Sequence, residues 1–192
     1  SSSLPVRLII DTDMSTDVDD VGAVCLAHAL QDREEVDLLA VVHDTGYPQG
    51  IAAVSVLNHY YNRDGIALGA YKGPFARDVP GKYNPDLVTN WSSPVKHYNQ
   101  VPDAVDVYRQ ILATQPDRSV TIASIGFTTN LAALLESKAD KFSSLDGQAL
   151  VAKKVKLISW MGGQYPNSGS NAEWNFGCGS GHTGPMWGCQ GS

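Results

Sequence analysis

Residues 9–20 carry the sequence IIDTDMSTDVDD, in which five carboxylates follow an apolar run that begins at residue 6. The apolar run predicts a strand buried on both faces, and the helical spacing of apolar residues after Asp19 predicts a helix. Unit charges about 4 Å apart repel by about 4 kcal/mol at the effective dielectric of a protein surface. Carboxylates that converge in this way either share a proton or bind a cation, and oxygen ligands favour Ca²⁺ or Mg²⁺. The segment therefore predicts a strand, an acidic loop and a helix that together form a cation site.

A simpler interpretation of the acidic loop is also open. Asp17 could cap the following helix with its carboxylate, and the other acidic side chains could then be solvated. Five carboxylates within ten residues, directly after a buried strand, exceed what a helix cap requires. The cation site is therefore the favoured hypothesis.

The composition restricts the classes of protein that the chain can belong to. It has 192 residues, of which 43% are hydrophobic and 18% are charged, and this is enough for a single domain over residues 1–192. The formal net charge of −6 argues against a nucleic-acid backbone or an anionic membrane as the main partner. No apolar run approaches the roughly 20 residues that a membrane span requires. We expect no nucleic-acid partner and no membrane span.

The first residue and the cysteines bear on the compartment. The chain begins with Ser1 rather than Met, and it has three cysteines, of which Cys25 lies within a predicted helix. Cys178 and Cys189 flank a Gly-rich segment and could form a disulfide or remain free thiols. The missing initiator Met and this cysteine pair favour a processed protein that is secreted or lumenal.

Apolar segments alternate with amphipathic segments along most of the chain. Strands are predicted at residues 6–10, 36–42, 66–70, 119–125 and 155–161, and helices from residue 19, over 51–61, from 102 and over 129–136. Residues 71–98 contain four prolines and predict a long loop, which is usually functional, mobile or an inter-subunit surface. We therefore expect a homo-oligomer or a subunit of a larger complex. The charged stretch after residue 136 predicts no clear element.

This alternation predicts a three-layer α/β fold, with a mainly parallel, Rossmann-like sheet and helices on both faces. Ligands bind outside the carboxyl ends of the strands in such sheets. Polar loops follow four of the predicted strands: residues 11–20, His43-Asp44, residues 126–130 and Gly162-Gly163. The loops should converge into one binding site at this edge. His43 could coordinate a metal or titrate, but a lone loop histidine is more often solvated, and this is the expectation for His43.

Three short motifs, taken in order, resemble those of a known enzyme family. Residues 11–20 contain an Asp-x-Asp motif followed by Asp-Asp at the start of the predicted helix. Residues 124–131, SIGFTTNL, form the second motif, and residues 160–163, WMGG, with residues 172–176, AEWNF, form the third. The combination resembles the inosine-uridine-preferring nucleoside hydrolase family, and the resemblance runs from about residue 6 to residue 176.

The resemblance implies metal-dependent hydrolysis of the N-glycosidic bond of purine or pyrimidine ribonucleosides, which releases base and ribose, with Ca²⁺ as the cofactor. A carboxylate beside the cation could deprotonate a water and direct it to the glycosidic carbon. By resemblance, Asp13 is the catalytic base and a metal ligand, Asp20 is a second ligand, and the carbonyl of Ile125 is a third. Asp11 orients these ligands. The implied substrate-binding residues are Asp19, Met161, Glu173 and Asn175.

The later motifs also have ordinary structural interpretations. Thr128 or Thr129 could cap a helix, and Gly162-Gly163 could form a plain turn. Glu173 and Asn175 are two residues apart, so in an extended segment they point to the same side. That alternation is common in any half-exposed strand.

Several features depart from the family pattern. Two extra residues separate the Asp pairs of residues 11–20, the loop after the second strand has no Asn, and nothing after Phe176 matches the late Asp and His of typical members. Asp13, Asp20 and one carbonyl leave a Ca²⁺ site short of its usual roughly 6 to 8 oxygens, so Ca²⁺ could bind weakly or be absent. Two hypotheses stay open: a nucleoside hydrolase, or a catalytically impaired nucleoside-hydrolase-like subunit with a structural or interaction role. The domain could be truncated after its fifth strand.

Overall fold

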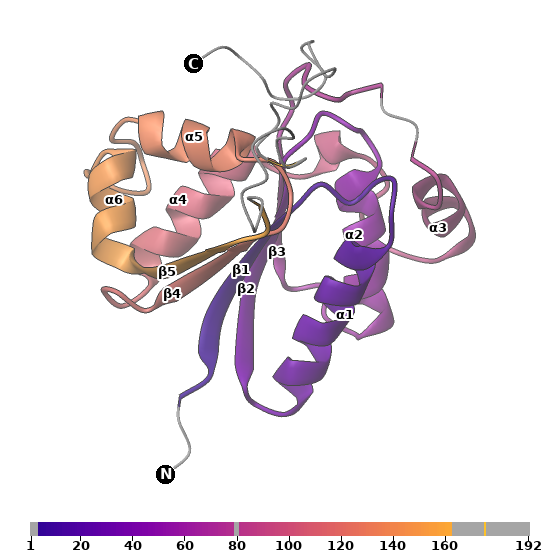
Figure 1. Ribbon diagram of the computed structural model, residues 1–192, viewed down its shortest axis with the longest axis horizontal. Coiled ribbons are helices and arrows are strands. Elements are labelled where there is room, and N and C mark those ends of the chain that lie inside the picture. The colour runs from indigo at the N-terminus through magenta and orange to yellow at the C-terminus, as the bar shows by residue number, and fades with distance from the viewer. Residues whose placement is uncertain (1–3, 79–80, 163–174, 176–192) are drawn as a thin grey trace, which may run out of the picture.

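In the part of the chain that the structure describes, five parallel strands form one sheet. The computed structural model describes residues 4–78, 81–162 and 175 (Figure 1). The strands are β1 (Val6–Thr12), β2 (Val36–His43), β3 (Ala67–Ala70), β4 (Val120–Ser124) and β5 (Val155–Trp160). Their order across the sheet is β3-β2-β1-β4-β5, and every neighbouring pair is parallel. The central strand β1 therefore ends between β2 and β4, at the edge where the acidic loop begins.

Helices cover both faces of the sheet (Figure 1). One face packs against α1 (Asp19–Asp32) and α2 (Gly50–Tyr60), and the other against α4 (Ala104–Thr114), α5 (Thr129–Glu136) and α6 (Gly147–Lys154). Successive side chains of β1 point to opposite faces of the sheet. Ile9 therefore packs beneath α4, α5 and α6, whereas Ile10 packs beneath α1 and α2. The predicted three-layer α/β fold with a parallel sheet is confirmed. Among the described helices, none is both long enough and apolar enough to cross a membrane.

The prediction of a loop over residues 71–98 is wrong in part, because the segment contains a short helix. This helix, α3 (Asn84–Asn90), has Pro85 in its first turn. Proline lacks a backbone N–H, but N–H groups in the first turn have no partner within the helix, so no helical hydrogen bond is lost. It packs against α2, and a 3-10 turn, η1 (Tyr98–Gln100), follows it. Since α3 has only seven residues, it carries too few apolar positions to produce a helical pattern in the sequence.

The charged stretch without a predicted element also contains a helix, α6. Asp146 caps this helix by accepting a hydrogen bond from the N–H of Ala149 at 2.9 Å. The connection between α5 and α6 is held by Arg109 of α4, which donates to Asp140 at 2.7 and 3.0 Å and to the carbonyl of Leu145 at 2.8 Å. Contacts between residues so far apart in the chain leave no local periodicity, so no pattern in the sequence predicts this helix.

Replacing Arg109 with Ala should lower the free energy of unfolding by about 3 kcal/mol, because it removes a buried side chain and leaves several partly buried acceptors without their donor. The side chain is only 1% exposed. Urea unfolding followed by circular dichroism measures the change. Arg33→Ala is the control, since the Arg33–Glu35 ion pair is exposed and contributes less than about 1 kcal/mol. Equal losses in the two variants would contradict the role given to Arg109.

Candidate functional site

A cavity of about 310 Å³ lies at the carboxyl edge of the sheet. It is lined by Asp13, Thr16, Asp17, Asp19, Asp20, Ile125, Met161 and Asn175. These residues come from the loop after β1, the first turn of α1 and the segments after β4 and β5. The pairing of β1 with β4, and of β4 with β5, brings these segments together. Six of the eight residues predicted for the site line this one cavity. Of the other two, Asp11 is buried outside the lining, and Glu173 lies outside the described residues.

Asp20 occupies the first turn of α1 and is 3% exposed. Its carboxylate accepts a hydrogen bond of 2.5 Å from the hydroxyl of Thr12, the last residue of β1. Burial, followed by the nearby charge of Asp13, raises the pKa of Asp20 to about 8. In the absence of a cation, the site therefore favours a proton on this carboxylate at neutral pH.

Asp11 is fully buried and is held by two donors. Its carboxylate accepts hydrogen bonds from the hydroxyl of Tyr108 at 2.8 Å and from the side-chain amide of Asn130 at 2.9 Å. Asn130 also donates to the carbonyl of His43 at 3.1 Å, so one amide joins the ends of β1 and β2 to α5. Burial raises the pKa of Asp11 to about 7, although both hydrogen bonds oppose the rise. These contacts fix the chain immediately before Asp13.

Asp44 is a further carboxylate of this region and is not among the predicted site residues. It is fully buried, and its carboxylate oxygens form no hydrogen bond of good geometry with the described residues, although the backbone of Phe127 lies close enough to oppose the rise of its pKa. Burial and then the charges of Asp11, Asp13 and Asp20 raise its pKa well above the ordinary value. The available signal was its place in one of the polar loops that follow the strands. Burial itself could not be foreseen from a polar dipeptide.

His43, the neighbour of Asp44, corrects an expectation. It is the last residue of β2 and is fully buried, not solvated, because the strand extends one residue beyond the predicted end. Gly50 lies against its imidazole so closely that a Cβ there would be 2.0 Å from Nε2. The ring is therefore a packed part of the site's support.

The electrostatics of the site fit a bound cation. Asp11, Asp20 and Asp44 are all buried, and none of the three forms an ion pair with a described Lys, Arg or His. One carboxylate oxygen from each of Asp17, Asp19 and Asp20 lies within 4.8 Å of the others. Hard oxygen donors at such spacing suit Ca²⁺ or Mg²⁺. Asp17 was absent from the predicted ligand set, although it lies in the same acidic run.

The helix-cap alternatives are wrong in this structure. Val18 is the N-cap residue of α1, and no side chain caps that helix, so Asp17 does not have this role. Thr128 is the N-cap residue of α5 without a capping hydrogen bond from its side chain, and the hydroxyl of Thr129 donates instead to the carbonyl of Asp44. The hydroxyl of Thr129 thus joins α5 to the loop after β2.

Asn175 connects the ends of β4 and β5. Its side-chain amide donates to the carbonyl of Met161 at 2.7 Å and lies 3.5 Å from the carbonyl of Ile125. It is 6% exposed, whereas Met161 is 46% exposed. The structure therefore brings the predicted carbonyl ligand and two predicted substrate-binding residues into one contact group.

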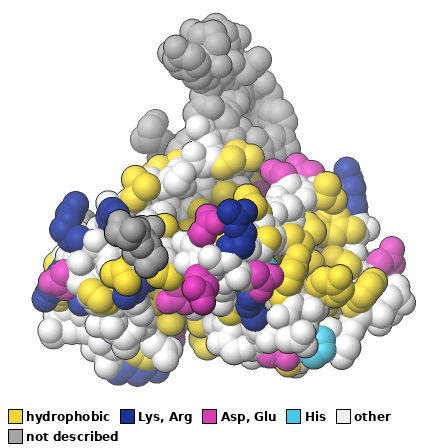
Figure 2. All heavy atoms as spheres, turned by 90° about the horizontal axis from the view of Figure 1, so that it is seen from below, with side chains coloured by type: hydrophobic (Ala, Val, Ile, Leu, Met, Phe, Trp, Pro, Cys, Tyr) yellow, Lys and Arg dark blue, Asp and Glu magenta, His cyan; other side chains and the backbone are white. Residues whose placement is uncertain are grey.

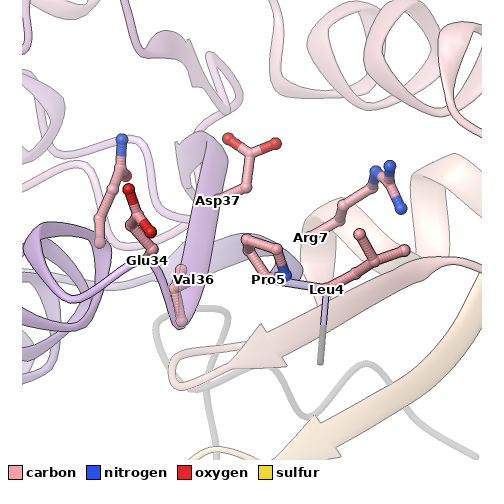
Figure 3. Close-up of a pocket in the computed structure, with 7 residues that line it drawn as sticks. Leu4, Pro5, Arg7, Glu34, Val36 and Asp37 are labelled. Atoms are coloured by element: carbon pink, nitrogen blue, oxygen red, sulfur yellow. The ribbon is translucent and has the colours of Figure 1, made fainter. Parts of the chain in front are cut away.

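A second cavity, of about 440 Å³, lies at the opposite edge, by the amino ends of β1 and β2 (Figure 3). It is lined by Leu4, Pro5, Arg7, Gln31, Glu34, Val36 and Asp37. Figure 3 shows the charged groups of Arg7, Glu34 and Asp37 spread around it rather than directed at one point. Figure 2, which views this edge, shows acidic and basic side chains interspersed with apolar ones. This cavity has no convergent set of polar groups, so we place the functional site at the carboxyl edge.

Replacing Gly126 with Ala should destabilise the protein by about 2 kcal/mol, because its Cβ would lie 2.3 Å from Asp44 Oδ2 and 2.6 Å from the backbone nitrogen of Asp13. Urea unfolding measures the loss. Gly22→Ala on α1 is the matched control, since a Cβ there meets nothing within 4 Å. This control should gain about 0.5 to 1 kcal/mol from helix propensity. A neutral Gly126→Ala would show that the close contact of the Asp13 and Asp44 loops is not required.

The fold and the cavity together define an α/β protein with a carboxylate-rich site at the carboxyl edge of a parallel sheet. The family model described as inosine-uridine preferring nucleoside hydrolase matches residues 8–179, and the chain belongs to this family. No match was found among curated proteins.

Solved structures share the fold. The type III effector protein XopQ, complexed with adenosine diphosphate ribose, is 22% identical with a TM-score of 0.68, over 86% of this chain and 45% of that one. The effector protein XOO4466 is 21% identical with a TM-score of 0.70, over 91% and 49%. The plant nucleoside hydrolase PpNRh1 is 23% identical with a TM-score of 0.54, over 83% and 48%. The chain spans about half the length of these structures.

Proposed function

We propose that this protein hydrolyses the N-glycosidic bond of ribonucleosides in a calcium-dependent reaction and releases base and ribose. The observation that carries the proposal is the convergence of Asp13, Asp20, Ile125, Met161 and Asn175 on one cavity. Its volume of about 310 Å³ lies at the lower end of the range for small-molecule sites, which suits a nucleoside. Family membership supports the same class of reaction.

The proposed ligands of Ca²⁺ are Asp13, Asp20 and the carbonyl of Ile125, which line the same cavity. Asp17 and Asp19 each have a carboxylate oxygen within 4.8 Å of one from Asp20 and could add further oxygens. A bound Ca²⁺ would supply ligation to the sugar hydroxyls and would lower the pKa of water at the site. Calcium is the proposed cation because carboxylates and a carbonyl can supply its many oxygen ligands, with waters completing the set.

Asp13 is the proposed general base. Its carboxylate accepts a proton from the attacking water as the new C–O bond forms at the glycosidic carbon and the C–N bond breaks. The departing base takes a proton from solvent. Because the carbon develops positive charge as the base leaves, the surrounding carboxylates stabilise the transition state more than the bound substrate.

The remaining residues bind and orient the sugar in this proposal. Asp19 and Asn175 would hold ribose hydroxyls, and the exposed side chain of Met161 would pack against the ring. Asp11, held by Tyr108 and Asn130, keeps the chain before Asp13 in place. Glu173 stays a proposed ribose contact outside the described residues.

The test is release of ribose from inosine or uridine by the purified full chain, with and without Ca²⁺, measured as reducing sugar. ADP-ribose belongs in the same assay as another ribosyl compound, since the XopQ structure contains it. The expected result is turnover that depends on Ca²⁺. No turnover at saturating Ca²⁺ would reject the hydrolase and favour the structural or interaction subunit. The expected oligomer, the single domain over residues 1–192 and the secreted or lumenal compartment stay predictions.

A further inference from the structure

The acidic loop between β1 and α1 is fastened to the rest of the protein through the backbone of Met14. Met14 is fully buried, and its N–H donates to the hydroxyl of Thr12 at 3.2 Å, while that hydroxyl donates to Asp20. The carbonyl of Met14 accepts a hydrogen bond of 3.0 Å from the side-chain amide of Asn84, 70 residues later in the chain. One peptide segment therefore links the positions of Asp13 and Asp20 to the start of α3.

A second hydrogen bond joins the same two segments. The backbone N–H of Lys82 donates to the carbonyl of Ser15 at 3.1 Å. Lys82 and Asn84 thus hold two successive carbonyls of the acidic loop, those of Ser15 and Met14. Residues 82–84, within the segment predicted to be a loop, therefore lie directly against the candidate cation site.

His43 is another side chain close to the Met14 carbonyl. Its Nε2 lies 3.3 Å from that oxygen, and its Nδ1 lies 3.2 Å from the carbonyl of Thr45. Burial lowers the pKa of His43 to about 4, so the neutral ring has one N–H and donates to only one of these carbonyls at a time. The amide of Asn84 carries its N–H groups at every pH. The side-chain amide of Asn84 can therefore donate to the carbonyl of Met14 at every pH, whichever carbonyl His43 donates to.

Packing alone does not explain why an asparagine is buried at position 84. It is 0% exposed, and its Oδ1 has no hydrogen-bond partner in the described part of the chain. A buried amide oxygen without a partner destabilises the folded state, because it has lost its hydrogen bonds to water without replacement. A leucine of similar size would avoid this cost but could not donate to Met14. The amide thus supplies a hydrogen bond that an apolar residue cannot replace.

We propose that Asn84 is a positioning residue for the cation site, which holds the carbonyl of Met14 so that the carboxylates of Asp13 and Asp20 line the same cavity. The inference rests on the proposed function, because it concerns the same site, but it acts on cation binding and is tested without turnover. It also gives residues 81–90 a role as the support of the acidic loop.

The experiment is calorimetric titration of the full chain with Ca²⁺ alone. Asn84→Leu keeps the volume and removes the donor, and it should weaken Ca²⁺ binding about tenfold, the equivalent of one lost hydrogen bond. Asn84→Ser retains a small donor and should recover part of the affinity. Asn58→Leu is the matched control, because Asn58 is 1% exposed and bonds to His28 at 2.8 Å, away from the acidic loop. Asn58→Leu should lower stability and leave the Ca²⁺ affinity unchanged.

The outcomes separate this inference from the proposed function. Wild-type affinity in Asn84→Leu, with a loss of stability like that of Asn58→Leu, would make Asn84 a core residue only and overturn the inference. A wild-type chain that takes up no Ca²⁺ would overturn both. A chain that binds Ca²⁺ but releases no ribose would overturn the proposed function alone, and the Asn84 comparison would still decide the inference.

Discussion

Replacing Asp13 with Ala should lower kcat/KM for calcium-dependent release of ribose by about 10³-fold, the contribution expected of a general base. The carboxylate lines the same cavity as Asp20, Ile125 and Asn175, where a nucleoside would bind. No other residue in this proposal accepts the proton of the attacking water. The assay is reducing-sugar release from inosine over a range of Ca²⁺ concentrations.

Two further variants divide the roles of base and ligand. Asp13→Asn keeps an oxygen donor but cannot accept a proton, so its kcat should stay low even at saturating Ca²⁺. Asp20→Asn should instead show a weaker Ca²⁺ affinity, with activity that recovers in part at high Ca²⁺. Asp37→Asn is the charge control, because Asp37 is exposed at the far edge of the sheet. Turnover by Asp13→Ala within a few-fold of the wild type would remove Asp13 from its proposed role.

In calcium-free buffer, the free energy of unfolding should fall by on the order of 2 kcal/mol between pH 7 and pH 9. The folded-state pKa values of Asp11 and Asp20 are raised from 3.8 to about 7 and about 8. The folded protein therefore keeps protons that the unfolded chain has already lost. The stability from these protons is complete below the unfolded pKa and is lost as the pH rises through the folded values.

The pH window is chosen to separate these carboxylates from the histidines. Burial lowers the pKa of both His28 and His43, and groups of this kind lower stability as the pH falls below about 6.5. Above pH 7 the histidines no longer change the free energy of unfolding. The fall in that free energy between pH 7 and pH 9 therefore reports the buried carboxyl groups. Urea titrations at pH 7, 8 and 9, with a chelator present, measure it.

Calcium should abolish the decline, because a bound cation compensates the ionised carboxylates of the site. Asp20→Asn should reduce the decline in calcium-free buffer, whereas the exposed Asp37→Asn should leave it unchanged. A calcium-free wild type whose stability is flat from pH 7 to pH 9 would show that Asp11 and Asp20 are not protonated in the folded state.

Much of the fold could be predicted because its signals are local. The apolar segments before Asp11 and around residues 36–42 are continuous runs, and continuous runs predict strands buried on both faces. The errors fall on elements without such runs. The helix α3 is too short to show a period, and α6 depends on Asp146 and on the contacts that Arg109 makes with the preceding connection.

The candidate site likewise contains some residues that the sequence could predict and others that it could not. Asp13, Asp20 and Ile125 could be proposed from motifs within a few residues of strand ends, and the parallel sheet brings such ends together. Asp44 could not be assigned, because its importance comes from full burial beside Gly126 and Asp13. A polar loop residue gives no sign of its burial before the chain is folded.

The sequence by itself determined the order along the chain of the five strands and of α1, α2, α4 and α5, the acidic loop after the first strand and the edge of the sheet at which a site forms. Apolar periodicity and the common direction of parallel strands are sufficient for these features. Only the tertiary structure decided that His43 and Asp44 are buried and that Asn84 holds the carbonyl of Met14. Burial and hydrogen bonds between residues 70 positions apart depend on how the layers pack, and no local pattern of residues encodes them.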